Sequence, residues 1–230
     1  AYTLSSPWIQ SFLNAYWDTD VERYVLVSPY YGVDAFAFRK RTKDADHILC
    51  LAIEMVCIVA WIHSHGFAHN DIKPDNFCVT PMGRLVIIDL QMCTIIGPPI
   101  VQGTSFYAAP EICVKQATPT MTDKCDVWSL GVTLFNFTSD RQLFEAADAS
   151  RCARFSGYQN LSYDIPSTNI ALIDLLISNA LEIEAAQRCT SLYLLNIVRA
   201  QIQEHGRVTD DNRFSTITTM TSNISGCSTN

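Results

Sequence analysis

The amino-acid sequence predicts an α+β fold that is mainly helical, and two patterns support this fold class. Apolar residues recur at helical spacing between residues 46 and 65, and again in most of the chain after residue 120. Two short runs, 7–17 and 23–28, are instead rich in the aromatic and β-branched residues typical of strands. Of the 230 residues, 48% are hydrophobic, so the chain can bury a substantial core.

The predicted elements follow one another in a definite order. The segment "DTDVE" between the two strands carries turn-type residues and closes a hairpin. The helix at 46–65 is apolar almost all round and is therefore expected at the centre of the fold, whereas "RLVIID", 84–89, is expected to be a short buried strand. Further helices are predicted for "DKCDVWSLGVTLFNF", "IALIDLLISNAL" and "SLYLLNIVRAQI". Residues 206–230 are rich in Ser, Thr and Asn, which predicts a flexible tail.

The composition argues against several classes of partner. The net charge is −7, with 16 basic and 23 acidic residues, so neither nucleic acid nor an anionic membrane is expected to bind. The basic run from Arg39 to Lys43 is expected in a solvated loop. Nine cysteines occur without a CxxC pair and mostly within apolar stretches, which indicates reduced thiols and a cytoplasmic or nuclear compartment. No apolar run is expected to span a membrane.

Polar residues suited to phosphoryl transfer gather in "GFAHNDIKPDNFCV", residues 66–79, and at the end of the strand that follows. Asp71, Lys73 and Asn76 lie within six positions, and Asp89 ends the strand. Phosphoryl transfer requires a positioned hydroxyl group, metal ions on the phosphate oxygens and a cation near the moving group. Asn76 and Asp89 offer hard oxygen ligands for Mg²⁺, Lys73 offers the cation, and Asp71 can accept a proton. These four residues are the candidate site.

Five motifs in this order resemble those of protein kinases. "HNDIKPDNF" is similar to the catalytic loop H-R-D-x-K-x-x-N, and "IIDLQ" is similar to the metal-binding D-F-G turn. "GTSFYAAPE" resembles the end of an activation segment, "DVWSLG" resembles the start of the central helix, and Arg188 occupies the place of the arginine that pairs with Glu111. The catalytic loop most resembles that of casein-kinase-type serine/threonine kinases. The resemblance implies a kinase C-terminal lobe at 32–205, after an N-terminal-lobe remnant of two strands and a hinge at 1–31.

The resemblance also implies a role for each matched residue. Asp71 would be the catalytic base, Lys73 would contact the γ-phosphate, Asn76 and Asp89 would hold Mg²⁺, and Thr104 would help to form the substrate-side pocket. The segment "YVLVSPYYGVD" aligns with the strand and hinge that hold ATP. The implied nucleotide contacts are Val27 as gatekeeper, Ser28, Tyr30 through its backbone N–H, Asp34 at the ribose, Cys78 beneath the adenine, and Asp89. The implied structural residues are His69, Glu111, Asp126 and Arg188. A protein would be the substrate.

The sequence departs from the family pattern at several points. Asn70 replaces the arginine of H-R-D, so no switch by phosphorylation of Thr94, Thr104 or Ser105 is expected. Leu90 and Gln91 replace the phenylalanine and glycine of D-F-G, and Gln91 resists backbone torsions that glycine allows. No Gly-rich loop, strand lysine or helix glutamate precedes the hairpin. Trp8 and Phe12 would then lack cover, and a capping segment or a partner protein is expected over the exposed hairpin edge.

Two classes of function stay open on the sequence alone. One is an ATP- and Mg²⁺-dependent serine/threonine kinase, of which this chain alone would show little or no catalysis. The other is a pseudokinase or C-lobe scaffold that acts by binding proteins. A zinc site at His63, His65 and His69 is disfavoured, because kinases commonly carry histidines in this stretch.

Overall fold

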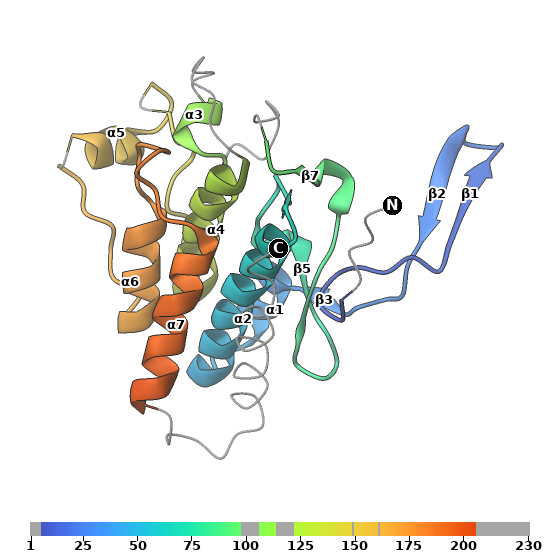
Figure 1. Ribbon diagram of the computed structural model, residues 1–230, viewed down its shortest axis with the longest axis horizontal. Helices are drawn as coiled ribbons and strands as arrows, with labels where there is room; N and C mark the ends of the chain where they lie inside the picture. Colours follow the sequence, from blue (N-terminus) through green and yellow to red (C-terminus); the bar gives the residue numbers. More distant parts are fainter. Residues whose placement is uncertain (1–5, 98–105, 114–121, 149, 161, 206–230) are drawn as a thin grey trace.

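The structure is a computed structural model that describes residues 6–97, 106–113, 122–148, 150–160 and 162–205, and it confirms the mainly helical α+β fold (Figure 1). The helices are α1 (Ala35–Arg41), α2 (Ala45–Ser64), α3 (Pro110–Cys113), α4 (Thr122–Ser139), α5 (Ala153–Gln159), α6 (Ala171–Ala180) and α7 (Ser191–His205). The strands are β1 (Asn14–Asp18), β2 (Arg23–Val27), β3 (Val33–Asp34), β4 (Phe67–Ala68), β5 (Phe77–Val79), β6 (Leu85–Ile87) and β7 (Thr94–Ile95). The predicted tail lies outside the described residues.

Helix α2 is the centre of the helical body, as its apolar sequence predicts. It begins where the Asp44 side chain accepts a hydrogen bond from the N–H of His47 at 3.0 Å, which is an N-cap. By length and composition α2 could also span a membrane, contrary to the expectation from sequence, but 72% of its most apolar window is buried inside the fold. The core of a protein domain accounts for this helix.

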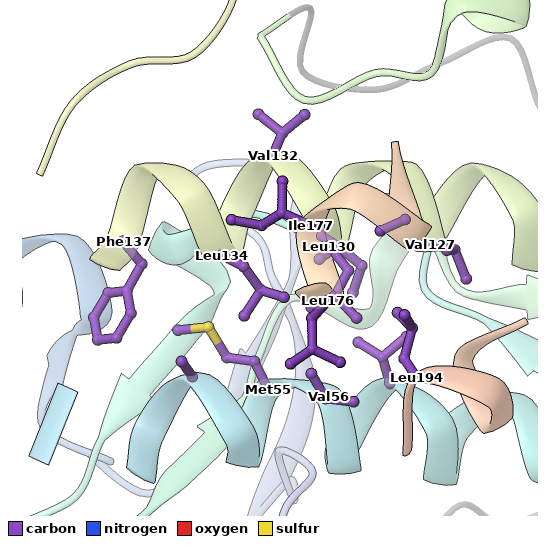
Figure 2. Close-up of a cluster of buried hydrophobic side chains, with 14 of the residues drawn as sticks. Met55, Val56, Val127, Leu130, Val132, Leu134, Phe137, Leu176, Ile177 and Leu194 are labelled. Atoms are coloured by element: carbon purple, nitrogen blue, oxygen red, sulfur yellow. The ribbon is translucent and has the colours of Figure 1, made fainter. Parts of the chain in front are cut away.

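The hydrophobic core forms where α2, α4, α6 and α7 pack together. Helix α2 contacts α4 and α7, and α4 also packs along α6. Figure 2 shows Met55 and Val56 of α2 facing side chains of α4, with Leu176 of α6 and Leu194 of α7 in the same cluster. Gly131 permits the close approach of α4 to the end of α6, because a Cβ atom there would lie 2.8 Å from the Cβ of Ala180. The body is thus held by apolar burial.

Three short strands lie beside this body and carry part of the candidate site. Strands β3, β5 and β6 form an antiparallel sheet in the order β3-β5-β6, with Asp34 opposite Cys78 and Phe77 opposite Ile87. The predicted strand at 84–89 is therefore present as β6. The other two strands of the sheet, β3 and β5, have only two and three residues, so they leave no periodic pattern in the sequence.

The predicted hairpin is present, but its first strand begins later than expected. Strands β1 and β2 pair antiparallel from Asn14 opposite Val27 to Asp18 opposite Arg23, and they project from the body (Figure 1). The start of the predicted strand at 7–17 is wrong, because the chain near Ile9 pairs with β6 instead. Trp8 is also not without cover, because its ring packs edge to face on that of Trp61, with the ring centroids 6.2 Å apart.

Residues 39–41 of the basic run are helical and not in a solvated loop as expected, whereas Lys43 is exposed in the loop after α1, as predicted. Residues 39–41 form the last turn of α1, and Arg39 donates from Nε to the carbonyl of Phe137 at 2.8 Å and from Nη2 to that of Thr138 at 3.1 Å. Lys40 pairs with Asp140 at 2.6 Å. Arg39 thus satisfies carbonyls at the end of α4, a position that favours positive charge.

Candidate active site

The loop that carries Asp71 is fixed by a buried carboxylate of helix α4. Asp126 Oδ2 accepts the backbone N–H of His69 at 2.7 Å, and Asp126 Oδ1 accepts that of Asn70 at 2.8 Å. Only 1% of the Asp126 residue surface is exposed. Hydrogen bonds to an ionised acceptor are the stronger kind, so the two residues before Asp71 are held firmly to the helical body.

His69 joins this loop to the end of β6. Its Nε2 lies 3.1 Å from the carbonyl of Ile88, and the N–H of Ile88 donates to the carbonyl of Asn76 at 2.8 Å. Burial lowers the pKa of His69, although the carboxylates of Asp126, Asp71 and Asp89 act to raise it. The ring is therefore neutral, with its proton on Nε2 toward Ile88 and with Nδ1 accepting the N–H of Asp71 at 3.3 Å.

The candidate catalytic residues converge on one oxygen atom. Asp71 Oδ2 accepts from Lys73 Nζ at 2.6 Å and from Asn76 Nδ2 at 3.0 Å. Asn76 Nδ2 also donates to the Asp71 carbonyl at 2.7 Å, so the short turn Pro74–Asn76 folds back over Asp71. The ammonium group and the amide together fix the orientation of the Asp71 carboxylate.

Asp89 comes directly after the β6 segment that is bonded to this loop. It is exposed and has left-handed backbone torsions, φ 59° and ψ 67°, and its N–H donates to Gln10 Oε1 at 3.0 Å. Ile88, the residue before it, lies 3.1 Å from His69 Nε2 through its carbonyl and donates its N–H to the Asn76 carbonyl at 2.8 Å. Asp89 therefore follows directly after the residue that bonds β6 to the catalytic loop.

The donor set suits Mg²⁺. The hydrogen bonds of Asn76 to Asp71 use its amide nitrogen, and its side-chain oxygen, like the Asp89 carboxylate, is a hard ligand of the kind that Mg²⁺ prefers. No group of three or more His, Cys, Asp or Glu side chains that could hold a metal occurs among the described residues, so a closed zinc-type site is absent there. Mg²⁺ commonly binds through only one or two protein oxygens together with phosphates, and two hard oxygens fit this mode.

The residues expected around the nucleotide lie along two neighbouring segments. Asp34 and Cys78 are paired positions of β3 and β5, which the sequence separates by 44 positions. The Asp34 side chain accepts the N–H of Ala37 at 2.7 Å and so caps α1, while Cys78 is 8% exposed. Val27 ends β2 and Tyr30 is 83% exposed. Ser28, between them, accepts a hydrogen bond from Gln10.

Gly32 permits the chain to pass from the hinge into β3. It has φ +118°, and a Cβ atom at this position would lie 2.1 Å from the carbonyl oxygen of Val79. A side chain cannot be accommodated so close to backbone, so only glycine allows β3 to approach β5.

Glu111 and Arg188 form a buried ion pair below the site. Arg188 donates from Nη1 to Glu111 Oε1 at 2.9 Å and from Nη2 to Glu111 Oε2 at 3.1 Å. Its guanidinium also donates to the carbonyls of Lys124, Glu182 and Ile183 and lies 5.2 Å from the Trp128 ring centroid. The pair joins α3 to the segment before α7. Thr104 and Ser105 lie outside the described residues.

Asn70, which replaces an arginine of the family pattern, holds the segment that follows Asp89. Its Nδ2 donates to the Met92 carbonyl at 2.7 Å and to Thr94 Oγ1 at 2.9 Å. Asn70 has φ 65°, a conformation that asparagine tolerates better than most residues. Leu90 and Gln91 form a 3-10 turn after Asp89, with Leu90 packed against the core.

Sequence reasoning missed two sets of supporting contacts. His63 lies between Asp126 Oδ2, at 3.0 Å from its Nε2, and Ser191 Oγ, at 2.8 Å from its Nδ1. The side chain of Gln10 contacts Asp89 and Ser28. Both sets join positions more than 15 residues apart, and no local pattern in the sequence indicates such contacts.

Known proteins resemble the chain over most of the described part. A family model described as "Protein kinase domain" matches residues 3–201. Maternal embryonic leucine zipper kinase of Xenopus laevis is 28% identical over 62% of the chain and 22% of its own length. Serine/threonine-protein kinase STK11 of Homo sapiens is 33% identical over 56% of the chain and 30% of its own length, and sperm motility kinase 2B of Mus musculus is 31% identical over 47% and 23%. The chain spans less than a third of each of these relatives.

Proposed function

Since the chain belongs to the protein kinase family, we propose that the protein is a serine/threonine kinase that uses ATP and Mg²⁺ to phosphorylate a protein substrate. The convergence of Lys73 and Asn76 on Asp71 Oδ2 carries this proposal, and the hydrogen bonds of Ile88, the residue before Asp89, to the same loop support it. Phosphoryl transfer requires an oriented carboxylate with a cation beside it, and Asp71 with Lys73 and Asn76 supports this reading.

Each residue of the site has a distinct task in the proposed reaction. The substrate hydroxyl oxygen forms a bond to the γ-phosphorus of ATP, the bond from that phosphorus to the oxygen of ADP breaks, and the hydroxyl proton passes to the carboxylate of Asp71. Lys73 places positive charge beside the group in transfer. Asn76 and Asp89 would hold Mg²⁺, which when bound neutralises charge on the phosphate oxygens.

We also propose that phosphorylation of the segment after Asp89 does not activate the protein. In the family, the arginine of H-R-D pairs with a phosphate on this segment, whereas here Asn70 holds the segment with hydrogen bonds to Met92 and Thr94. An amide carries no positive charge, so it gains nothing from a nearby phosphate. Phosphomimetic changes such as Thr94→Glu are therefore expected not to raise activity, and a many-fold increase would contradict this.

Phosphate transfer in the full-length protein tests the main proposal. The assay measures transfer from ATP to casein and to the protein itself, with and without Mg²⁺. Asp71→Asn and Asp89→Asn are each expected to reduce transfer by about 100-fold or more, the size of general-base and charge-stabilising effects. Asp75→Asn is the matched control, because Asp75 is exposed on the same loop and outside the proposed machinery. Transfer that persists in both site variants, or that is absent in the wild type, would contradict the proposal.

A protein-binding scaffold is the second candidate function, and the hairpin favours it. Tyr16, Trp17, Tyr24 and Leu26 are each at least 46% exposed, and the rings of Trp17 and Tyr24 meet at 5.0 Å on the projecting strands. Large exposed apolar surfaces mark sites of protein contact. We propose that a capping segment or a partner protein covers this surface. Normal thermal stability without any response to Mg·ATP, together with no transfer, would favour the scaffold over the kinase.

We further propose a reducing cytoplasmic or nuclear location and neither nucleic acid nor membrane as a partner. The cysteines of the described residues form no disulfide bond. The acidic net charge of −7 opposes binding to polyanions. Imaging of the tagged full-length protein in a secretory or membrane compartment would overturn this placement.

A further inference from the structure

The segment before the hairpin runs beside the strand that leads to Asp89. Ile9 and Ile87 form a parallel β-bridge, in which Gln10 N donates to Ile87 O at 2.9 Å and Ile87 N donates to Trp8 O at 2.8 Å. Ile9 is buried, with 4% of its surface exposed. The backbone of Gln10 is therefore anchored to β6 two residues before Asp89.

The side chain of Gln10 uses both of its polar atoms. Its Oε1 accepts the backbone N–H of Asp89 at 3.0 Å, and its Nε2 donates to Ser28 Oγ at 3.2 Å. Ser28 belongs to the hinge segment that follows β2, and Asp89 belongs to the proposed metal site. One partly buried amide thus links the two regions that would hold opposite ends of ATP.

The contact is made at a residue whose backbone needs support. Asp89 is the residue before the short turn Leu90–Met92 and has positive φ, which costs energy for a residue that carries a Cβ atom. Gln10 Oε1 gives the Asp89 N–H a partner in this conformation. Without it, this N–H would have to turn to water, and the direction of the Asp89 carboxylate would be less restricted.

We propose that Gln10 is a positioning residue for Asp89, and that through Ser28 it couples the metal side of the site to the adenine side. This inference rests on the proposed function, because it takes Asp89 to be a ligand of Mg²⁺. It also goes beyond it, since Gln10 belongs to none of the kinase motifs in the sequence. A glutamine side chain suits the role because it offers an acceptor and a donor at its end.

The role predicts a separation between metal binding and nucleotide binding. Loss of the Gln10 side-chain amide should weaken the binding of Mg²⁺ in the presence of ATP, because Asp89 is then less well oriented. It should change the binding of ATP in EDTA much less, because on the adenine side only the hydrogen bond from Gln10 to Ser28 is lost, whereas Asp89 would act on the nucleotide through Mg²⁺. A residue that only stabilised the fold would instead change both affinities together or neither of them.

Calorimetric titration of the full-length protein with ATP, first in EDTA and then over a range of Mg²⁺ concentrations, tests this. Gln10→Met keeps the length of the side chain and removes both polar atoms. It is expected to raise the Mg²⁺ concentration for half-saturation roughly three- to tenfold, the size of one lost hydrogen bond, with ATP affinity in EDTA within about twofold of the wild type. Ser28→Ala should also raise the Mg²⁺ concentration for half-saturation, by about twofold. It removes only the hydrogen bond between Gln10 and Ser28 and leaves the one to Asp89.

Two further measurements keep the result specific. Hydrogen exchange at the Asp89 amide should be faster in Gln10→Met than in the wild type, since its acceptor is gone. Gln142→Met is the matched control, because Gln142 is exposed and its side-chain amide also hydrogen-bonds, to the Phe144 carbonyl. Gln142→Met should leave the Mg²⁺ requirement unchanged.

The outcomes separate this inference from the proposed function. Mg·ATP binding in the wild type, with an unchanged Mg²⁺ requirement in Gln10→Met, overturns the role of Gln10 and leaves the kinase proposal intact. An equal loss of ATP affinity with and without Mg²⁺ also overturns it. A wild-type protein that binds no Mg·ATP overturns both proposals. Should Gln10→Met fail to fold, Ser28→Ala decides, and no shift in that variant counts against the coupling.

Discussion

Replacement of Asp126 is the most direct test of how the catalytic loop is held. Asp126 accepts the backbone N–H groups of His69 and Asn70 at 2.7 and 2.8 Å, and the Nε2 of His63 lies 3.0 Å from its Oδ2. Asp126→Ala removes the acceptors of two backbone donors in a nearly dry site. A buried donor left without a partner costs about 1–3 kcal/mol, so the free energy of unfolding should fall by about 2–6 kcal/mol.

Asp126→Asn distinguishes the charge from the shape of this side chain. Asparagine keeps one acceptor oxygen but turns an NH₂ group toward one of the two backbone donors. It should therefore cost less than alanine and still more than about 1 kcal/mol. The proposed catalysis should also fall, because Asp71 follows directly after the released residues.

Urea unfolding and residue-resolved hydrogen exchange together measure these effects. Exchange at the amides of His69 and Asn70 should accelerate in both variants beyond the change in global stability, because their acceptor is lost locally. Asp164→Asn, at an exposed position, is the control. Neutral surface changes alter the free energy of unfolding by about 0.5 kcal/mol or less. A change no larger than this, with unchanged protection at the amides of His69 and Asn70, would show that Asp126 does not hold the loop.

Two further predictions concern buried titratable groups, the Glu111–Arg188 ion pair and His69. Arg188→Met should lower the free energy of unfolding by about 3–5 kcal/mol, because Glu111 would stay buried without its cation. In chemical denaturation, the double variant Glu111→Gln/Arg188→Met should recover part of this loss. No recovery would show that the ion pair is not the cause. Stability should fall as the pH drops below 6.5, the ordinary pKa of histidine, because burial lowers the pKa of His69 and the unfolded chain then binds a proton that the folded chain excludes. Urea midpoints at several pH values measure this, and His69→Gln should flatten the dependence while the exposed His65→Gln should not.

The sequence predicted those parts of the fold in which a long periodic pattern decides the structure. Helix α2 was expected at 46–65 and lies at Ala45–Ser64, since twenty residues of nearly unbroken apolar character leave few alternatives. Helix α1 was missed because its basic residues suggested a solvated loop, whereas the stem and guanidinium of Arg39 lie on the end of α4. Strands β3 and β5 are too short to show alternation, and only their pairing in space defines them.

In the candidate site, too, the residues on one loop were predicted from the sequence, whereas the contacts between distant segments were not. Asp71, Lys73 and Asn76 lie on a single short loop, so their motif spacing predicted that they would come together, and the structure brings them together. The contacts of His63 with Ser191 and of Gln10 with Asp89 join segments that are 128 and 79 positions apart. Such contacts depend on how helices and strands pack, and a single sequence contains no local signal of them.

The two halves of the site rest on different supports, and this has a functional consequence. Asp71 depends on Asp126 and therefore on the helical body, which buries most of the apolar core. Asp89 depends on Gln10 and therefore on the segment that leads into the exposed hairpin. Binding at the hairpin would thus act on Asp89 through Gln10, whereas Asp126 of α4 holds the loop before Asp71. The partner proposed for the hairpin would then act first on Asp89, the proposed metal ligand, and less on Asp71, the proposed base.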